Sequence, residues 1–341
     1  MPSKGKKKII MVILILALLI IIVIDRLENF QVAYDKEMEI NFTNLGTNLS
    51  GSLYLPDTPP PYDVVFFIHG DGPQDRTLNG GYALIMNHLL DQGIACFSYD
   101  KAGVSKSEGN WLKQTMKDRS NEVEAALKVL ENKVSIEKKG VLGFSQGGWV
   151  ISELSKSEAP IDFIVIVGGA IDWMDQHIYY ETKVAERRDY TEKEKKDYLS
   201  YVKTYDKFIV KNDYKGYVDF VLNHDYGKTM SKERFHFAHL NLDANATKGI
   251  KTMTVPFLGM FGEKDQNVDI YESYKIYDDT FKAMGKENYE LYIFPDATHE
   301  LLKSKYQDKE HLLLLHSFLI GEKIYTREFL DTLSNWIKGL P

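Results

Sequence analysis

Cysteine is almost missing from this chain of 341 residues. The single thiol, Cys96, excludes an internal disulfide framework and a zinc site built on several thiolates. The chain also has no excess of positive charge. Its formal net charge is −7, which argues against a nucleic-acid-binding protein with a basic face. With 44% hydrophobic residues the chain is not of the disordered class. Its length fits one large α/β domain with an insertion, or two ordinary domains.

One long apolar run stands near the N-terminus, over residues 9–24, between Lys8 and Asp25. At 1.5 Å per residue it spans about 24 Å, somewhat less than the ~30 Å hydrocarbon core, a gap that local bilayer thinning closes. The run predicts an uncleaved transmembrane signal anchor over 9–24, after a basic tail (1–8) and before a short stalk (25–35). A cleaved signal peptide is the alternative, although no A-x-A pattern of small residues follows the run.

The charge around this run predicts the orientation of the protein. Four lysines lie before it and none lies within it; they are Lys4, Lys6, Lys7 and Lys8. Because positive flanks stay in the cytoplasm, we expect a single-pass membrane protein with a cytoplasmic N-terminus. The large domain would then lie on the extracytoplasmic side.

Residues 36–341 show the pattern of an α/β domain. Residues 37–42 and 48–55 alternate apolar and polar side chains and predict a β-hairpin. Short apolar segments then alternate with amphipathic ones, and strands are expected at 64–68, 94–99, 139–144, 161–167, 255–261 and 289–294. Short, fully apolar strands separated by helices are typical of a mostly parallel sheet with helices on both faces.

This alternation is interrupted over about residues 173–251. The interrupted stretch is rich in Tyr, Lys and Glu, has helical periodicity and contains no convincing buried strand. It predicts a helical cap insertion. Trp173, Met174 and Tyr180 begin the cap, and we expect them either to pack in its core or to line a substrate pocket.

The segment Gly143-Phe144-Ser145-Gln146-Gly147 matches the G-x-S-x-G pattern of a nucleophilic serine. It lies between an expected strand and an expected helix. A serine at such a sharp turn needs small flanking residues, because side chains there would collide with neighbouring backbone. The pattern predicts Ser145 as a nucleophile.

The expected acid and base follow Ser145 along the chain. Asp265 comes just after the strand at 255–261, and His299 lies in the loop after the strand at 289–294. A histidine takes the serine proton, and a carboxylate holds the imidazole in the right tautomer. Glu263 and Asp269 are less favoured substitutes for the acid. The catalytic set is therefore predicted as Ser145, Asp265 and His299.

An oxyanion hole needs two backbone N–H groups. One is expected from Gln146, the residue after the nucleophile, and the other from the loop after the strand at 64–68, where we favour Asp71 over Gly72. His69 in the same loop is expected to be structural, and Asp75 and Arg76 to pair with each other.

With these motifs the chain resembles the α/β-hydrolase superfamily from about residue 36 to the C-terminus. It is similar to bacterial carboxylesterases related to prolyl-oligopeptidase and serine-aminopeptidase-like hydrolases. The segments that carry the likeness are residues 49–56, 69–76, 98–107 and 143–148. One departure is Lys101-Ala102, where many relatives have Arg at the second position; we expect it to affect local packing only.

The resemblance implies a serine hydrolase that cleaves carboxylic esters through an acyl-enzyme. A thioesterase or a serine peptidase would use the same triad, and an inactive binding module is the alternative outside enzymes. The partners expected are a small-molecule acyl substrate and the membrane, without nucleic acid. No cofactor is expected, and no metal, because His236 and His239 lack a carboxylate that would complete a ligand set.

Overall fold

A computed structural model describes residues 26–341 together with Met11, Ile13 and Val23. The predicted tail and nearly all of the predicted anchor over 9–24 lie outside the described residues. Within the part that the structure describes, no helix is long and apolar enough to cross a bilayer.

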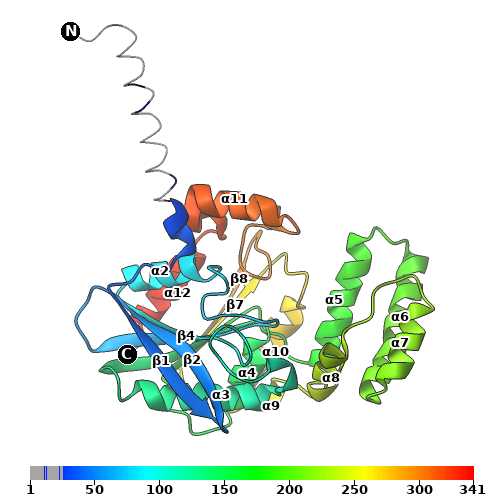
Figure 1. Cartoon of the computed structure of the whole chain (residues 1–341), viewed down its shortest axis with the longest axis horizontal. Coiled ribbons are helices and arrows are strands. Elements are labelled where there is room, and N and C mark those ends of the chain that lie inside the picture. Colours follow the sequence, from blue (N-terminus) through cyan, green and yellow to red (C-terminus); the bar gives the residue numbers. More distant parts are fainter. Residues whose placement is uncertain (1–10, 12, 14–22, 24–25) are drawn as a thin grey trace.

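One eight-stranded sheet forms the centre of the described chain (Figure 1). Its strands are β1 Lys36–Asn44, β2 Thr47–Leu55, β3 Tyr62–Ile68, β4 Ala95–Tyr99, β5 Ile136–Phe144, β6 Phe163–Val167, β7 Phe257–Gly262 and β8 Tyr289–Phe294. They lie in the order β1-β2-β4-β3-β5-β6-β7-β8. The pairs β1–β2 and β2–β4 are antiparallel and the others are parallel. The predicted mostly parallel α/β sheet is confirmed.

The predicted hairpin is confirmed in β1 and β2. Asn44 lies opposite Thr47 in the register, and the two residues between them, Leu45 and Gly46, have φ of 47° and 83°. Positive φ at both central positions is the type I′ turn, whose twist matches that of the flanking strands.

Side chains of the central strands alternate between two hydrophobic cores, one on each face of the sheet. In β3, for example, Val64 and Phe66 belong to one core, and Val65 and Phe67 belong to the other. Successive side chains of a strand point to opposite faces, so a strand covered on both sides is apolar throughout. This is the physical reason for the continuous apolar runs in the sequence.

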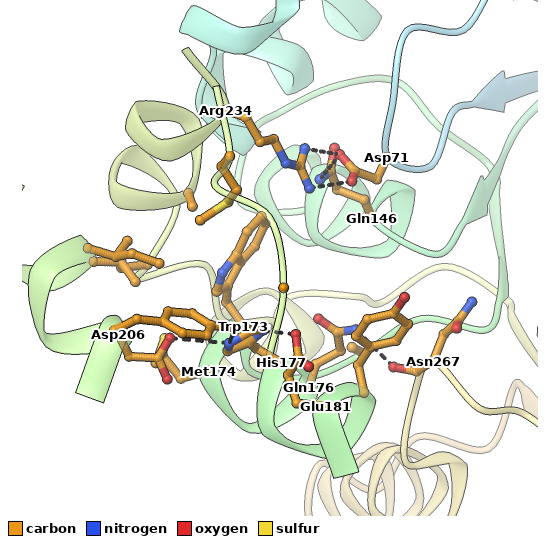
Figure 2. Close-up of a pocket in the computed structure, with 18 of the residues that line it drawn as sticks. Asp71, Gln146, Trp173, Met174, Gln176, His177, Glu181, Asp206, Arg234 and Asn267 are labelled. Atoms are coloured by element: carbon orange, nitrogen blue, oxygen red, sulfur yellow. Dashed lines mark hydrogen bonds and ion pairs between the residues drawn. The ribbon is translucent and has the colours of Figure 1, made fainter. Parts of the chain in front are cut away.

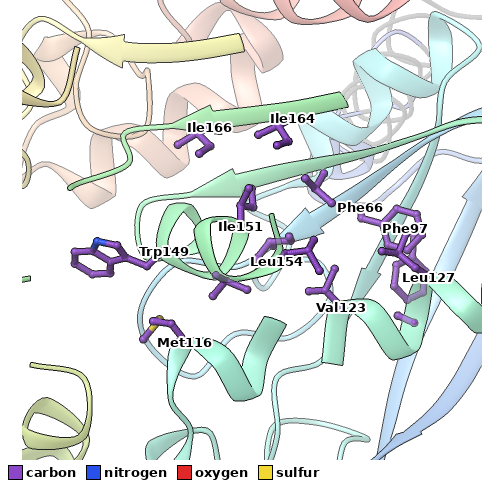
Figure 3. Close-up of a cluster of buried hydrophobic side chains, with 14 of the residues drawn as sticks. Phe66, Phe97, Met116, Val123, Leu127, Trp149, Ile151, Leu154, Ile164 and Ile166 are labelled. Atoms are coloured by element: carbon purple, nitrogen blue, oxygen red, sulfur yellow. The ribbon is translucent and has the colours of Figure 1, made fainter. Parts of the chain in front are cut away.

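Helices cover both cores. The first core is covered by α3 Met116–Leu130, α4 Gly147–Leu154 and α10 Ile270–Ala283, and the second by α2 Ala83–Asp91 and α12 Phe329–Lys338. Figure 3 shows the first core, with side chains of α3 and α4 packed against those of the strands. The Thr115 hydroxyl caps α3 by accepting a hydrogen bond from Asp118 N, and the Asp118 carboxylate in turn accepts one from Thr115 N.

The expected cap segment is helical. Between β6 and β7 the described chain forms α5 Trp173–Arg187, α6 Glu192–Val210, α7 Tyr214–Leu222, α8 Lys232–Leu240 and the short α9 Thr247–Ile250. In Figure 1, α5 to α8 stand beside the body of the domain. A separate hydrophobic core rich in aromatic residues, including Tyr201, Tyr217 and Phe235, holds these helices together.

The sequence analysis did not anticipate the helix α11 Glu310–Ile320, which lies between β8 and α12. Its apolar residues are continuous from Leu312 to Leu315, so the run does not show the one-sided periodicity by which the other helices were recognised. The short 3-10 helix η1 Glu28–Phe30, at the start of the continuous described chain, packs against α11 and α2.

Candidate active site

Ser145 lies on a sharp turn between β5 and α4. Its φ is 51°, in the left-handed region that a residue with a side chain rarely adopts. Ser145 N donates to Val167 O at 2.9 Å, and Gly148 N donates to Ser145 O at 2.9 Å, so the turn is fixed on both sides. Backbone strain of this kind collects at functional sites, where the surrounding structure holds it in place.

Two close approaches around Ser145 require glycine. A Cβ added at Gly147 would lie 2.4 Å from Ile68 O, and one at Gly168 would lie 2.9 Å from His299 Nδ1. Gly168 has φ of 59°. Because Val167 holds Ser145 N and Gly168 lies beneath the His299 ring, the end of β6 connects the turn of Ser145 with the loop of His299.

Asp265 and His299 form a buried pair. His299 Nδ1 lies 2.6 Å from Asp265 Oδ2, and the side chain of Asp265 is fully buried. The other oxygen, Oδ1, accepts hydrogen bonds from Asn267 N at 2.7 Å and Val268 N at 2.9 Å. The carboxylate is thus held by its own loop, and its second oxygen is directed to the imidazole.

This pairing changes the pKa of His299. Burial of the imidazole favours its neutral form, but the charge of Asp265 and its hydrogen bond outweigh burial and raise the pKa of His299 to about 9. Beside Asp265 the imidazole is therefore a stronger base than an ordinary histidine, and its neutral form can take a proton from a neighbouring hydroxyl.

The two N–H groups expected to form the oxyanion hole have no acceptor within the described chain. Neither Asp71 N nor Gln146 N donates a hydrogen bond to another described group. The Gln146 side chain instead donates from Nε2 to Asp71 Oδ1 at 3.2 Å, which joins the two segments. Two N–H groups without acceptors, beside a serine, can bind an anion.

Two buried cations hold these segments: Arg119, which the sequence analysis did not single out, and Lys101, which it expected to affect local packing only. Arg119 donates to Gln146 Oε1 at 2.6 Å and to His69 O at 2.6 Å. Lys101 Nζ donates to Gly70 O at 3.1 Å and to Gly72 O at 2.8 Å. Burial lowers the pKa of the Lys101 ammonium well below its usual range, and nearby Arg119 lowers it further. The departure at Lys101 thus contacts the loop of Asp71, which no local pattern indicated.

A third cation comes from the cap. Arg234 of α8 donates to both oxygens of Asp71, at 2.8 Å and 2.5 Å, and Figure 2 shows the two side chains facing each other beside Gln146. Burial opposes ionisation of Asp71, but Arg234 holds the pKa of this carboxyl below its usual range. The sequence analysis missed Arg234 because its partner is 163 residues away.

One cavity, called here the cap cavity, lies between the cap helices and the turn of Ser145. Its volume is about 570 Å³, and Trp173, Met174 and Tyr180 line it together with Ser145, Gln146 and Asp71 (Figure 2). The structure therefore brings the expected pocket residues and Ser145 to one space. Trp173 also stacks on Trp149, with ring centroids 5.1 Å apart, so it contributes to packing as well.

A second cavity, of about 510 Å³, leads from Ser145 in another direction. His299 lines it, as do Tyr82, Phe30 and Leu314, so it runs between the site, η1 and α11. It is called here the α11 cavity. Ser145 lies where the two cavities meet, since it lines both.

The expected pairing of Asp75 with Arg76 is wrong. Arg76 binds Asp100 through Nε at 3.1 Å and Nη2 at 2.7 Å, while Asp75 Oδ1 accepts hydrogen bonds from the following turn, including Thr77 N at 2.9 Å. His69 Nε2 lies 2.6 Å from Tyr99 O, and burial lowers the pKa of its imidazole to about 3. His69 is therefore a neutral residue bound within the core.

The sheet order, the serine on its positive-φ turn after β5 and the Asp–His pair beyond β7 and β8 are those of an α/β-hydrolase. Comparison with protein families agrees: the model of the family described as serine aminopeptidase, S33, matches residues 59–305. The chain belongs to this family of hydrolases. No curated protein matches the chain significantly.

Solved structures share the fold. An esterase of Pyrococcus furiosus superposes with a TM-score of 0.56 at 17% identity, over 89% of this chain and 91% of that one. An esterase of Exiguobacterium antarcticum superposes with a TM-score of 0.54 at 14% identity, over 88% of this chain and 100% of that one. Proline iminopeptidase of Mycobacterium smegmatis superposes with a TM-score of 0.53 at 14% identity, over 88% of this chain and 98% of that one. At these identities the likeness establishes the fold alone.

Proposed function

We propose that this hydrolase is a serine carboxylesterase in which Ser145 is the nucleophile, His299 the base and Asp265 its orienting acid. The observation that carries the proposal is the buried His299–Asp265 pair, at 2.6 Å, whose imidazole lines the same cavity as a serine on a positive-φ turn. Gly168 beneath the imidazole supports the close placement of the two segments.

The reaction would run in two balanced halves. Ser145 Oγ attacks the ester carbonyl carbon while its proton passes to His299, and the carbonyl oxygen becomes an anion beside the N–H groups of Asp71 and Gln146. The bond to the alcohol oxygen then breaks, and this oxygen leaves with the proton from His299. Water attacks the acyl-enzyme in the same way, the carboxylic acid leaves, and Ser145 regains its proton.

The experiment is the substitution Ser145→Ala, with hydrolysis of a short activated ester and labelling by a fluorophosphonate as readouts. Loss of a triad nucleophile typically removes several orders of magnitude in rate. Ser152, buried in α4, is a matched control, because Ser152→Ala removes a hydroxyl that donates its hydrogen bond to Ala246 O, away from the turn of Ser145. An alanine variant at 145 that still turned over the ester at the wild-type rate would contradict the triad. A thioester of the same acid would show whether sulfur leaving groups are also accepted.

A second candidate function is favoured by one observation. Besides Asp71, the acidic side chains of Glu181 and Asp206 line the cap cavity with Ser145, and an aminopeptidase needs such groups to bind a substrate amino terminus. Both are already engaged: Asp206 Oδ1 lies 3.2 Å from His177 Nε2, and Glu181 accepts hydrogen bonds from Tyr198 and Tyr205. A substrate ammonium would have to displace these contacts, and therefore the esterase is the preferred proposal.

The proposed setting is a membrane, with residues 9–24 as a single anchor and the hydrolase domain on the extracytoplasmic side. The support is the apolar run of the sequence and the four lysines before it. Protease added to intact cells should digest the domain and leave a small membrane-bound remnant. Protection of the domain, or release of a free protein that starts near residue 30, would contradict this setting.

A further inference from the structure

Helix α11 exposes an unusual amount of apolar surface. Leu314, Leu315 and Leu319 are 59%, 52% and 48% exposed, and Ile320 is 37% exposed. Positions 315 and 319 are four residues apart and therefore lie on one face of the helix. A contiguous apolar face on one short helix, rather than scattered single residues, indicates a surface that binds something apolar.

The start of the described chain is attached to this helix. Asn29 Nδ2 donates to Ser317 O and to Phe318 O, each at 3.1 Å. Ala33 N then donates to Asn87 Oδ1 at 2.7 Å, which fixes the next residues along α2. Figure 1 shows η1 against α11. The chain is therefore fixed to the domain from η1 onward.

The proposed anchor ends close to this attachment. The apolar run ends at Ile24, and Glu28 opens η1 four residues later. Four extended residues span at most about 14 Å. If residues 9–24 cross a bilayer, α11 lies close to the membrane surface, because only a short stretch of chain separates the apolar run from η1.

The α11 cavity connects this surface with the candidate site. Leu314, more than half exposed, lines the cavity at one end, and Ser145 and His299 line it at the other. Apolar side chains such as Leu78, Ile85 and Leu302 form much of the wall between them. A hydrocarbon chain could thus reach Ser145 from the α11 surface along this cavity.

We infer that the α11 face rests in the membrane leaflet and that the α11 cavity admits an ester whose alcohol portion carries hydrocarbon chains and resides in the bilayer. The inference rests on the proposed esterase activity and membrane anchor. His299 lines this cavity, and in the proposed reaction it protonates the leaving oxygen. The alcohol portion therefore belongs on this side of Ser145, and the acyl portion in the cap cavity.

A spin label tests the contact with lipid without depending on activity. The full-length chain, with a nitroxide on Leu315→Cys, is reconstituted in phosphatidylcholine vesicles; Cys96 is fully buried and can stay in place. The control site is Leu222→Cys on the cap, where the native leucine is 73% exposed. The label at 315 should collide with dissolved oxygen and be shielded from a water-soluble nickel chelate, and the label at 222 should do the reverse. Equal access to nickel at both sites, or concentration-dependent spin–spin broadening at 315 from a second copy, would overturn the inference.

Activity provides the second readout. The double variant Leu315→Glu with Leu319→Glu changes two exposed residues that do not line the cavity, and Leu222→Glu is its matched control. We expect the double variant to hydrolyse the vesicle-borne acetate of a long-chain alcohol about ten-fold more slowly, with no change on a short water-soluble ester. Phenylalanine at both positions should preserve the wild-type rate.

The two proposals fail in different ways. If the wild type hydrolyses neither ester, the proposed esterase fails, whereas the spin label still reports whether α11 meets lipid. If the wild type hydrolyses the short ester and the double variant is as active as the wild type on both esters, the proposed esterase activity is retained and the inference about the α11 cavity is wrong. A parallel loss on both esters would also overturn it, because the effect of the two leucines would then not depend on whether the ester lies in the bilayer.

Discussion

Arg234 of the cap holds Asp71 of the loop after β3 through both carboxylate oxygens, at 2.8 Å and 2.5 Å. The same carboxylate accepts a hydrogen bond from Gln146 Nε2, so one ion pair connects the cap to both segments of the proposed oxyanion hole. The side chains are 33% and 43% exposed, and solvent therefore screens the pair. We therefore expect the Arg234–Asp71 ion pair to fix the position of the loop after β3 rather than to contribute much to the free energy of unfolding.

The first prediction concerns this pair. Arg234→Met should lower kcat for a short ester by about ten-fold, because the loop that presents Asp71 N–H loses its fixed position. The melting temperature should change little. The control is Lys193→Met, which removes an exposed cap cation that pairs with Asp197. A loss of kcat in Arg234→Met that matched the control would show that the ion pair does not position the loop.

The second prediction is a pH dependence. Only neutral His299 can accept the Ser145 proton, and Asp265 raises the pKa of the imidazole above its ordinary value. The acid limb of kcat/KM should therefore lie on the alkaline side of 6.5, the ordinary histidine pKa, so that activity rises with pH through the neutral range. Asp265→Asn should move this limb to lower pH and reduce the rate by about three to four orders of magnitude. A limb at the same pH in both proteins would exclude Asp265 as the partner that sets the pKa.

The third prediction concerns the acyl portion of the substrate. Met174→Ala enlarges the cap cavity beside Ser145 and should change the ratio of kcat/KM between long and short acyl chains, since one methylene of pocket fit is worth about 1–3 kcal/mol. Trp173→Ala should also lower the melting temperature, because Trp173 packs on Trp149 and Phe237. Leu222→Ala, on the exposed cap surface, is the control. A uniform loss over all chain lengths in Met174→Ala would assign this residue to packing.

The fourth prediction separates the two candidate functions. If the protein is an esterase, Glu181→Gln and Asp206→Asn should not change the ratio of kcat/KM for an aminoacyl amide to kcat/KM for its N-acetylated form. For an aminopeptidase, either substitution should selectively weaken turnover of the free-amino substrate, because a carboxylate that binds the ammonium is lost. The measurement is kcat/KM for the matched pair of substrates. A selective loss would favour the aminopeptidase over the proposed esterase.

The parts of the fold that follow from local pattern were predictable. Strand β8, Tyr289–Phe294, has the bounds expected from its sequence, and the other predicted strands differ from the observed ones by only a few residues at their ends. The turn at Ser145 and the loops of Asp265 and His299 follow the strands after which they were expected. These features depend on the periodicity of burial and on residues within a few positions of each other.

Contacts between distant segments were not predictable in the same way. Arg76 pairs with Asp100 rather than with its neighbour Asp75, because the loop after β3 lies against the end of β4 in the sheet. The local sequence does not reveal that Arg119 and Lys101 are buried, yet both are almost fully buried beside the loop of Asp71. Their partners are mostly carbonyl oxygens, which every residue has and which leave no signature in a sequence.

The sequence by itself determined the mostly parallel sheet, the order of Ser145, Asp265 and His299, and the apolar run before the domain. Each of these features follows from a pattern of residues that are close to one another in the sequence. Only the tertiary structure decided that Arg234 reaches Asp71, that α11 exposes its leucines beside Asn29, and that two cavities meet at Ser145. The physical reason is that these features depend on how helices dock on the sheet, and docking is fixed by the sum of many weak packing contacts rather than by any one residue.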